Sequence, residues 1–130
     1  MNKLESIKKA IEAAESVLEY YKIDGEDSPR IAIDAIKKWI ESPTEENMAI
    51  ITSAHDNVNK ATVTAALSAQ MFRDWPLHHD AFIINGCAAW AAGASRAAAK
   101  ASMSGDINAE IAAKDAVDFA KRCLLLSKGE

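Results

Sequence analysis

The chain has 130 residues, of which 49% are hydrophobic and 26% charged, and its net charge is −4. This length fits one domain, residues 1–130, because a single core commonly organises about 100–150 residues, and this composition excludes a disordered chain. The acidic balance argues against a nucleic-acid partner, and no apolar run of roughly 18 residues or N-terminal leader pattern indicates a membrane span or a signal peptide.

Two amphipathic helices are predicted before residue 42. Apolar residues recur at helical spacing from Leu4 to Tyr21, and the pattern ends at residues 23–25, where a glycine suits the close of a helix. Ser28 followed by Pro29 is typical of an N-cap and a first helical residue, since proline loses no backbone hydrogen bond at that position. We therefore expect the second helix to begin at this pair.

A third, long helix is predicted directly after the second. Ser42 and Glu45 have the spacing of a capping box, which indicates a helix start with almost no loop before it. One apolar stripe then continues from Met48 to Phe72, which predicts a helix of up to about thirty residues. Because most helices are much shorter, about 11–12 residues, a break near residues 56–57 is left open.

The last part of the chain predicts two more helices. Residues 74–76 interrupt the pattern, a fourth helix extends to about Ser102, and its stretch 88–99 is almost entirely alanine and other small residues. Residues 104–106 suit a turn and cap before a last helix that ends near Gly129. No strand-like alternation occurs, so we expect an all-α, compact bundle of four to five antiparallel helices with an alanine-rich core helix, whose small side chains let neighbouring helices approach closely.

Residues that could carry chemistry are present, but no catalytic pattern joins them. Cys87 and Cys123 lie within helical patterns without a CxxC spacing, which favours buried, reduced thiols and a cytoplasmic protein. His79 has Ile83 four residues later, where a zinc pair would need a second ligand. The chain also lacks a nucleophile elbow, a phosphate loop and a zinc-protease motif. We expect no metal, no cofactor and no enzyme activity.

Two polar groups outside the alanine-rich helix are candidates for binding. His55, Asn59 and Thr62 form one polar line beside the apolar stripe of the third helix, which either meets solvent or belongs to a pocket or interface. Asp27 and Arg30 lie in the loop into the second helix, where they either satisfy the helix start or recognise a partner. Both alternatives are open at this point.

The alanine-rich helix itself presents one unusual face. Gly86, Trp90, Gly93 and Ala97 share that face, so small residues surround one large ring. Close helix packing with Trp90 in the core explains this pattern. Space for a ligand also explains it, with Trp90 as a stacking platform and Arg96 as the partner of an anion or carboxylate. The sequence leaves open whether this helix lines a pocket or a subunit interface.

Two stretches carry a resemblance to a known family. Residues 14–21 (AESVLEYY) and residues 26–35 (EDSPRIAIDA), with Trp39 after them, resemble the segments "CAExVLPxFE" and "DDRPRxAIEAARxW" of the Imm-5-like family of immunity proteins. The resemblance implies a compact helical protein that neutralises something by binding it. Two positions depart from the family, because Ser28 replaces the first arginine of "DRPR" and Cys87 stands at the nearest match to the family's histidines.

Three functions without catalysis follow. The first is an immunity-type protein that neutralises a protein toxin or effector through Asp27, Arg30 and His55. The second is a phage-type anti-defence sponge that sequesters a small nucleotide signalling molecule as a homo-oligomer, with Trp90 stacking on the base and Arg30 or Arg96 holding the phosphate. The third is a structural helical assembly module without a ligand.

Overall fold

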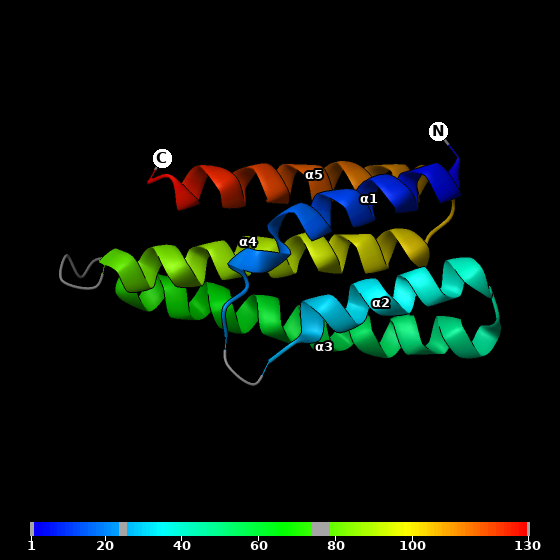
Figure 1. The fold of residues 1–130 in the computed structure, drawn as a ribbon, viewed down its shortest axis with the longest axis horizontal. Helices are drawn as coiled ribbons and strands as arrows, with labels where there is room; N and C mark the ends of the chain where they lie inside the picture. Colours follow the sequence, from blue (N-terminus) through cyan, green and yellow to red (C-terminus); the bar gives the residue numbers. More distant parts are fainter. Residues whose placement is uncertain (1, 24–25, 74–78, 130) are drawn as a thin grey trace.

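Five α-helices form the fold in the computed structural model, which describes residues 2–23, 26–73 and 79–129. Successive helices run antiparallel along one long axis (Figure 1). No strand occurs in these ranges, so the prediction of an all-α bundle is confirmed, and no helix in them is long and apolar enough to span a bilayer. In chain order the elements are α1 (Lys3–Val17) with the short 3-10 turn η1 (Leu18–Tyr20), α2 (Ser28–Glu41), α3 (Glu45–Phe72), α4 (His79–Ser102) and α5 (Asp106–Ser127).

The first two helices differ from the prediction at one end each. α1 ends at Val17, where the backbone leaves the helical conformation, and only η1 continues the stripe beyond it. α2 begins at Ser28, so its N-cap is Asp27, one residue earlier than predicted. The carboxylate of Glu26 explains this shift, because it accepts hydrogen bonds from both the backbone N–H (2.7 Å) and the hydroxyl of Ser28. That acceptor satisfies the first turn without a capping side chain at the position predicted.

The predicted capping box at the start of α3 is wrong. The N-cap is Thr44, whose hydroxyl accepts the backbone N–H of Asn47 at 3.1 Å, and the side chain of Asn47 donates to the carbonyl of Ser42 at 2.7 Å. Ser42 instead closes the preceding helix as the C-cap of α2, so the first turn of α3 begins two residues later than the capping box requires. From Glu45 onward α3 is an unbroken α-helix, so the break considered near residues 56–57 does not occur.

The later boundaries follow the predicted turns where the structure describes them. The predicted break at residues 74–76 lies outside the described residues. α4 ends at Ser102, and Gly105 is the N-cap of α5, as the predicted turn at residues 104–106 requires. α5 ends at Ser127 and is followed by Gly129, whose φ of +79° only glycine adopts freely.

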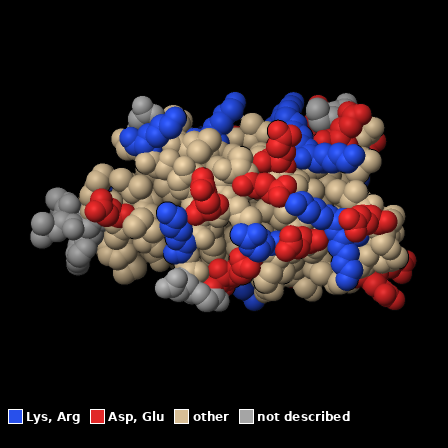
Figure 2. Space-filling model, in the orientation of Figure 1, with Lys and Arg blue, Asp and Glu red and all other residues tan. Residues whose placement is uncertain are grey.

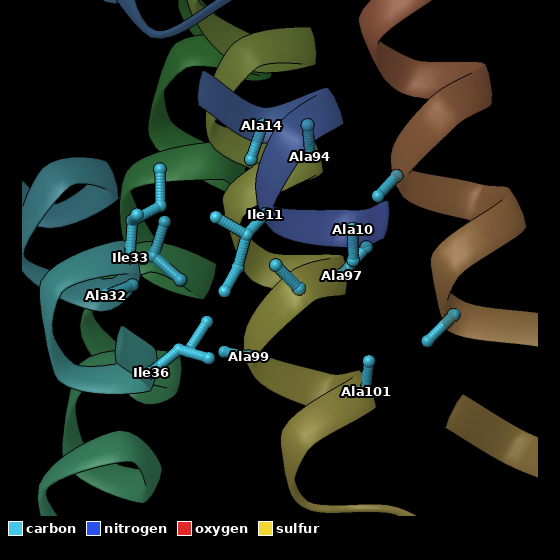
Figure 3. Close-up of a cluster of buried hydrophobic side chains, with 14 of the residues drawn as sticks. Ala10, Ile11, Ala14, Ala32, Ile33, Ile36, Ala94, Ala97, Ala99 and Ala101 are labelled. Atoms are coloured by element: carbon cyan, nitrogen blue, oxygen red, sulfur yellow. The ribbon is translucent and has the colours of Figure 1, made fainter. Parts of the chain in front are cut away.

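α4 is the central element of the bundle, and it packs against α1, α2, α3 and α5. More than half of its residues are buried, and every one of these is alanine, glycine, serine or cysteine. Large side chains on the surrounding helices compensate for this lack of volume. Figure 3 shows Ile11 from α1 and Ile33 and Ile36 from α2 directed toward the alanines of α4. The core is therefore built from large residues on the outer helices packed onto a thin central helix.

Candidate functional site

A groove of about 500 Å³ lies where α3, the C-terminal half of α4 and α5 meet. Its volume is within the range of about 300–1,000 Å³ that small-ligand sites occupy. Three residues proposed separately from the sequence, His55, Asn59 and Arg96, come together in it. The complete lining is His55 and Asn59 from α3, Arg96, Ala97 and Lys100 from α4, Met103 and Ser104 from the following turn, and Asp115 and Phe119 from α5.

Arg96 bridges the three helices that form the groove. Its Nη1 donates a hydrogen bond to Oδ1 of Asn59 at 3.2 Å, and its guanidinium carbon lies 5.9 Å from the ring centre of Phe119. Neither Arg96 nor Lys100 forms an ion pair with any residue that the structure describes. Two cations that form no ion pair within the described ranges therefore line one groove, together with the carboxylate of Asp115, in a chain whose net charge is −4.

The polar line predicted on α3 divides into two parts. His55 is half-buried at the groove, with its Nδ1 3.8 Å from Oδ1 of Asp56, and Asn59 lies one turn further along. Thr62 takes no part in the lining, because its hydroxyl donates to the carbonyl of Val58 within α3 at 2.7 Å. The groove is thus bounded on the α3 side by one imidazole and one amide.

Trp90 lies beside this groove rather than along it. Its ring packs against Phe119 with 5.7 Å between ring centres and an angle of 31° between the ring planes. The guanidinium carbon of Arg122 lies 5.2 Å from the centre of the Trp90 ring. Arg122 in turn bonds the carboxylate of Asp118 at 2.9 Å. The aromatic ring that lines the groove is therefore Phe119, with Trp90 supporting it from behind.

The small-residue face of α4 receives side chains of α5. A Cβ placed on Gly93 would lie 3.4 Å from Cδ2 of Phe119, and one placed on Gly86 would lie 2.5 Å from Cδ2 of Leu126. Both glycines thus allow the close approach of two helices within the chain. At these two positions the structure agrees with the packing alternative, and the groove opens further along α4, at Arg96, Ala97 and Lys100.

Asp27 and Arg30 are not part of the groove. Arg30 Nε lies 3.5 Å from Asp27 Oδ1 at the start of α2, and both side chains are largely exposed. The structure therefore separates the six predicted site residues into an assembled set of His55, Asn59 and Arg96, the neighbouring Trp90, and this exposed ion pair.

Sequence reasoning missed Lys100, Asp115 and Phe119 as site residues. A signal existed for each, since Lys100 follows Arg96 by four residues and Phe119 follows Asp115 by four, so each pair shares one helix face. That spacing is also typical of a solvated face, and only the packing of α5 on α4 brings the two faces together.

The two cysteines lie in the seam between α4 and α5, and both are buried and free, as the sequence predicts. Cys87 Sγ lies 3.7 Å from the carbonyl oxygen of Cys123, and Cys123 Sγ lies 3.4 Å from that of Cys87. Burial raises the pKa of both thiols, that of Cys123 to about 12. At neutral pH both are therefore protonated and poorly nucleophilic.

No cluster of three metal-ligating side chains occurs among the described residues. Comparison of the chain with protein-family models, with curated proteins and with solved structures finds no significant match. The chemistry of the groove follows from its own side chains: Arg96 and Lys100 suit an anion, Asp115 accepts hydrogen bonds, and Phe119 presents an aromatic surface.

Proposed function

We propose that this chain is a non-catalytic binding protein that sequesters a small anionic ligand of the nucleotide class in the groove between α3, α4 and α5. One observation carries the proposal: Arg96 and Lys100, two cations that form no ion pair with the residues that the structure describes, line the same groove as the aromatic ring of Phe119. A nucleotide combines the two matching features, a charged phosphate and a planar base.

Each part of such a ligand has a partner of suitable chemistry. The guanidinium of Arg96 and the ammonium of Lys100 bind phosphate through charge-assisted hydrogen bonds. Phe119 offers its ring to the base, while Asn59 and His55 offer polar atoms to the edge of the base. Asp115 accepts hydrogen bonds from sugar hydroxyls.

Sequestration is favoured over turnover by the state of the groove's one hydroxyl. The side chain of Ser104 donates to the carbonyl of Lys100 at 2.6 Å, so its proton is directed to the backbone and away from any base. Activation of a hydroxyl nucleophile requires a base within hydrogen-bond reach. The setting we propose is the cytoplasm, where buried thiols such as Cys87 and Cys123 stay reduced.

The test is calorimetric titration with AMP, GMP and their triphosphates, supported by thermal shift. Arg96→Ala removes a charge-assisted bond of about 1.5–3 kcal/mol, which predicts a roughly 10- to 150-fold loss of affinity. Arg122→Ala is the matched control, since this arginine pairs with Asp118 and lies outside the groove lining, and it should leave affinity unchanged. Absence of binding by every nucleotide, or equal losses in the two variants, would contradict the proposal.

Neutralisation of a protein toxin, which the Imm-5-like resemblance implies, is the second candidate. Its supporting observation is the surface at the start of α2, where the exposed Asp27–Arg30 pair adjoins the exposed side chain of Ile31. Mixed polar and apolar surfaces of this kind suit protein partners. Arg30→Ala combined with Ile31→Ser should abolish binding of a toxin and leave nucleotide binding intact, whereas the reverse pattern would assign the function to the groove.

The homo-oligomer that accompanies the sponge hypothesis has a suitable surface on α3. Val63, Leu67 and Met71 recur every four residues on its outer face, with exposed fractions of 48%, 58% and 71%. Residues 61–72 and 81–95 contain no charged residue, and the end of the molecule where α3 meets α4 carries few charges in Figure 2. We propose a second copy of this chain as the partner, because two identical i±4 ridges can interdigitate about a two-fold axis without opposing like charges.

A further inference from the structure

The groove continues into a second, smaller compartment at the start of α5. This compartment has a volume of about 240 Å³ and shares three lining residues, Lys100, Ser104 and Asp115, with the large compartment described above. Its own residues are Asn108, Ile111 and Ala112. The two compartments therefore adjoin each other, and a cation and a carboxylate lie between them.

The two compartments differ in the chemistry they offer. Phe119 and the guanidinium of Arg96 belong to the large compartment only. None of the described residues that line the small compartment is aromatic, and its polar groups are the amide of Asn108, the hydroxyl of Ser104, the carboxylate of Asp115 and the ammonium of Lys100. An amide and a carboxylate beside a short aliphatic wall suit a group that presents several hydroxyls and little flat surface.

The volume of the small compartment also favours a small group that presents hydroxyls. At about half the volume of the large compartment, it matches a unit smaller than a nucleoside. Lys100 stands between the two compartments, where a phosphate link between two units would lie, and Arg96 approaches the same region from the large compartment. A single ligand that fills the groove therefore has a base at one end, phosphate in the middle and a sugar at the other end.

We infer that the ligand is a nucleotide whose phosphate carries a second pentose, an inference that rests on the proposed nucleotide-binding function. The base and first ribose occupy the large compartment, Lys100 and Arg96 bind the phosphate link, and the second pentose occupies the small compartment. Asn108 and Asp115 then receive the hydroxyls of that second pentose, so they determine selection between this ligand and a simple nucleotide.

The experiment compares AMP, ADP-ribose and diadenosine diphosphate by titration calorimetry. ADP-ribose should bind at least about tenfold more tightly than AMP, because only ADP-ribose fills both compartments. Asn108→Ala should remove most of that difference while leaving AMP affinity unchanged. Asn57→Ala makes the same chemical change on an exposed helical position outside both compartments, and it should leave all three affinities unchanged.

Three results would overturn the inference, and one of them would also refute the proposed nucleotide binding. Equal affinities for AMP and ADP-ribose, with no effect of Asn108→Ala, would show that the small compartment is not used, while the proposed nucleotide binding would stand. Tighter binding of diadenosine diphosphate than of ADP-ribose would mean that the second unit is a base. Binding by none of the three would instead refute the proposed function itself.

Discussion

Gly93 offers a quantitative test of the seam between α4 and α5. It lies inside α4 with an ordinary helical backbone, where glycine costs about 1 kcal/mol relative to alanine. The Cβ of an alanine would lie 3.4 Å from Cδ2 of Phe119 and no closer to any other side chain, which is ordinary van der Waals contact. Gly93→Ala should therefore raise the free energy of unfolding by about 1 kcal/mol, which raises the melting temperature by roughly 4 °C for a domain of this size.

Gly86 provides the matched comparison on the same helix. A Cβ at this position would lie 2.5 Å from Cδ2 of Leu126, so the leucine must move. The clashing atom is the terminal methyl of the partly exposed Leu126, whose displacement cancels part of the helix-propensity gain of about 1 kcal/mol. Gly86→Ala should therefore be less stable than Gly93→Ala.

Both glycine variants are measured by urea and thermal unfolding followed through helical circular dichroism, together with nucleotide affinity. A melting temperature of Gly93→Ala below that of the parent chain would refute the reasoning, because it would mean that Phe119 cannot yield even slightly. Loss of nucleotide affinity in a stabilised Gly93→Ala protein would show that the added methyl group displaces the ring from the groove.

Three further outcomes follow from burial and charge. Ala94→Leu should lower the free energy of unfolding by about 1–3 kcal/mol in urea titrations despite its added hydrophobicity, since Ala94 is fully buried in the thin central helix. Burial raises the pKa of Cys123 from 9.0 to about 12, and burial with the charge of Glu26 raises that of Tyr21 from 10.0 to about 12. The unfolded groups ionise first, so stability should be complete below pH 9 and decline toward pH 12, less steeply in Cys123→Ala than in the parent chain. Light scattering should show a dimer. Leu67→Glu should convert this dimer to a monomer, and Ile107→Glu, at an even more exposed apolar position on α5, should leave it intact; a monomeric parent chain at about 100 μM would contradict the proposed α3 interface.

The fold was predictable because its signal is local and repeated. Apolar spacing along each segment identifies the helices, and the excess of alanine between residues 88 and 99 identifies the helix that others surround. Helix ends were less predictable, since neighbouring polar residues compete to cap them. Glu26 outcompetes Ser28 as the acceptor at α2, and Thr44 caps α3 because Ser42 already serves as the C-cap of α2.

The site was predictable only in part, for a different reason. The sequence indicates each of three site residues separately, because each is a polar residue beside an apolar stripe or an alanine run: His55, Asn59 and Arg96. Their meeting depends on the register of α3 against α4, since the hydrogen bond between Asn59 and Arg96 spans 37 residues of sequence. Lys100 resembles any charged residue of a solvated face, and nothing local in the sequence indicates that α5 closes the other side of the groove.

The distribution of charge along α4 connects its packing with the proposed function. From residue 81 to residue 95 the helix has no charged side chain, both where it is buried, at residues 86–88 and 91–95, and where it is exposed, as at Ile84. Arg96 and Lys100 follow directly, one turn apart, and both line the groove. Two cations one turn apart on one wall of the groove are the arrangement that the proposed anion site requires.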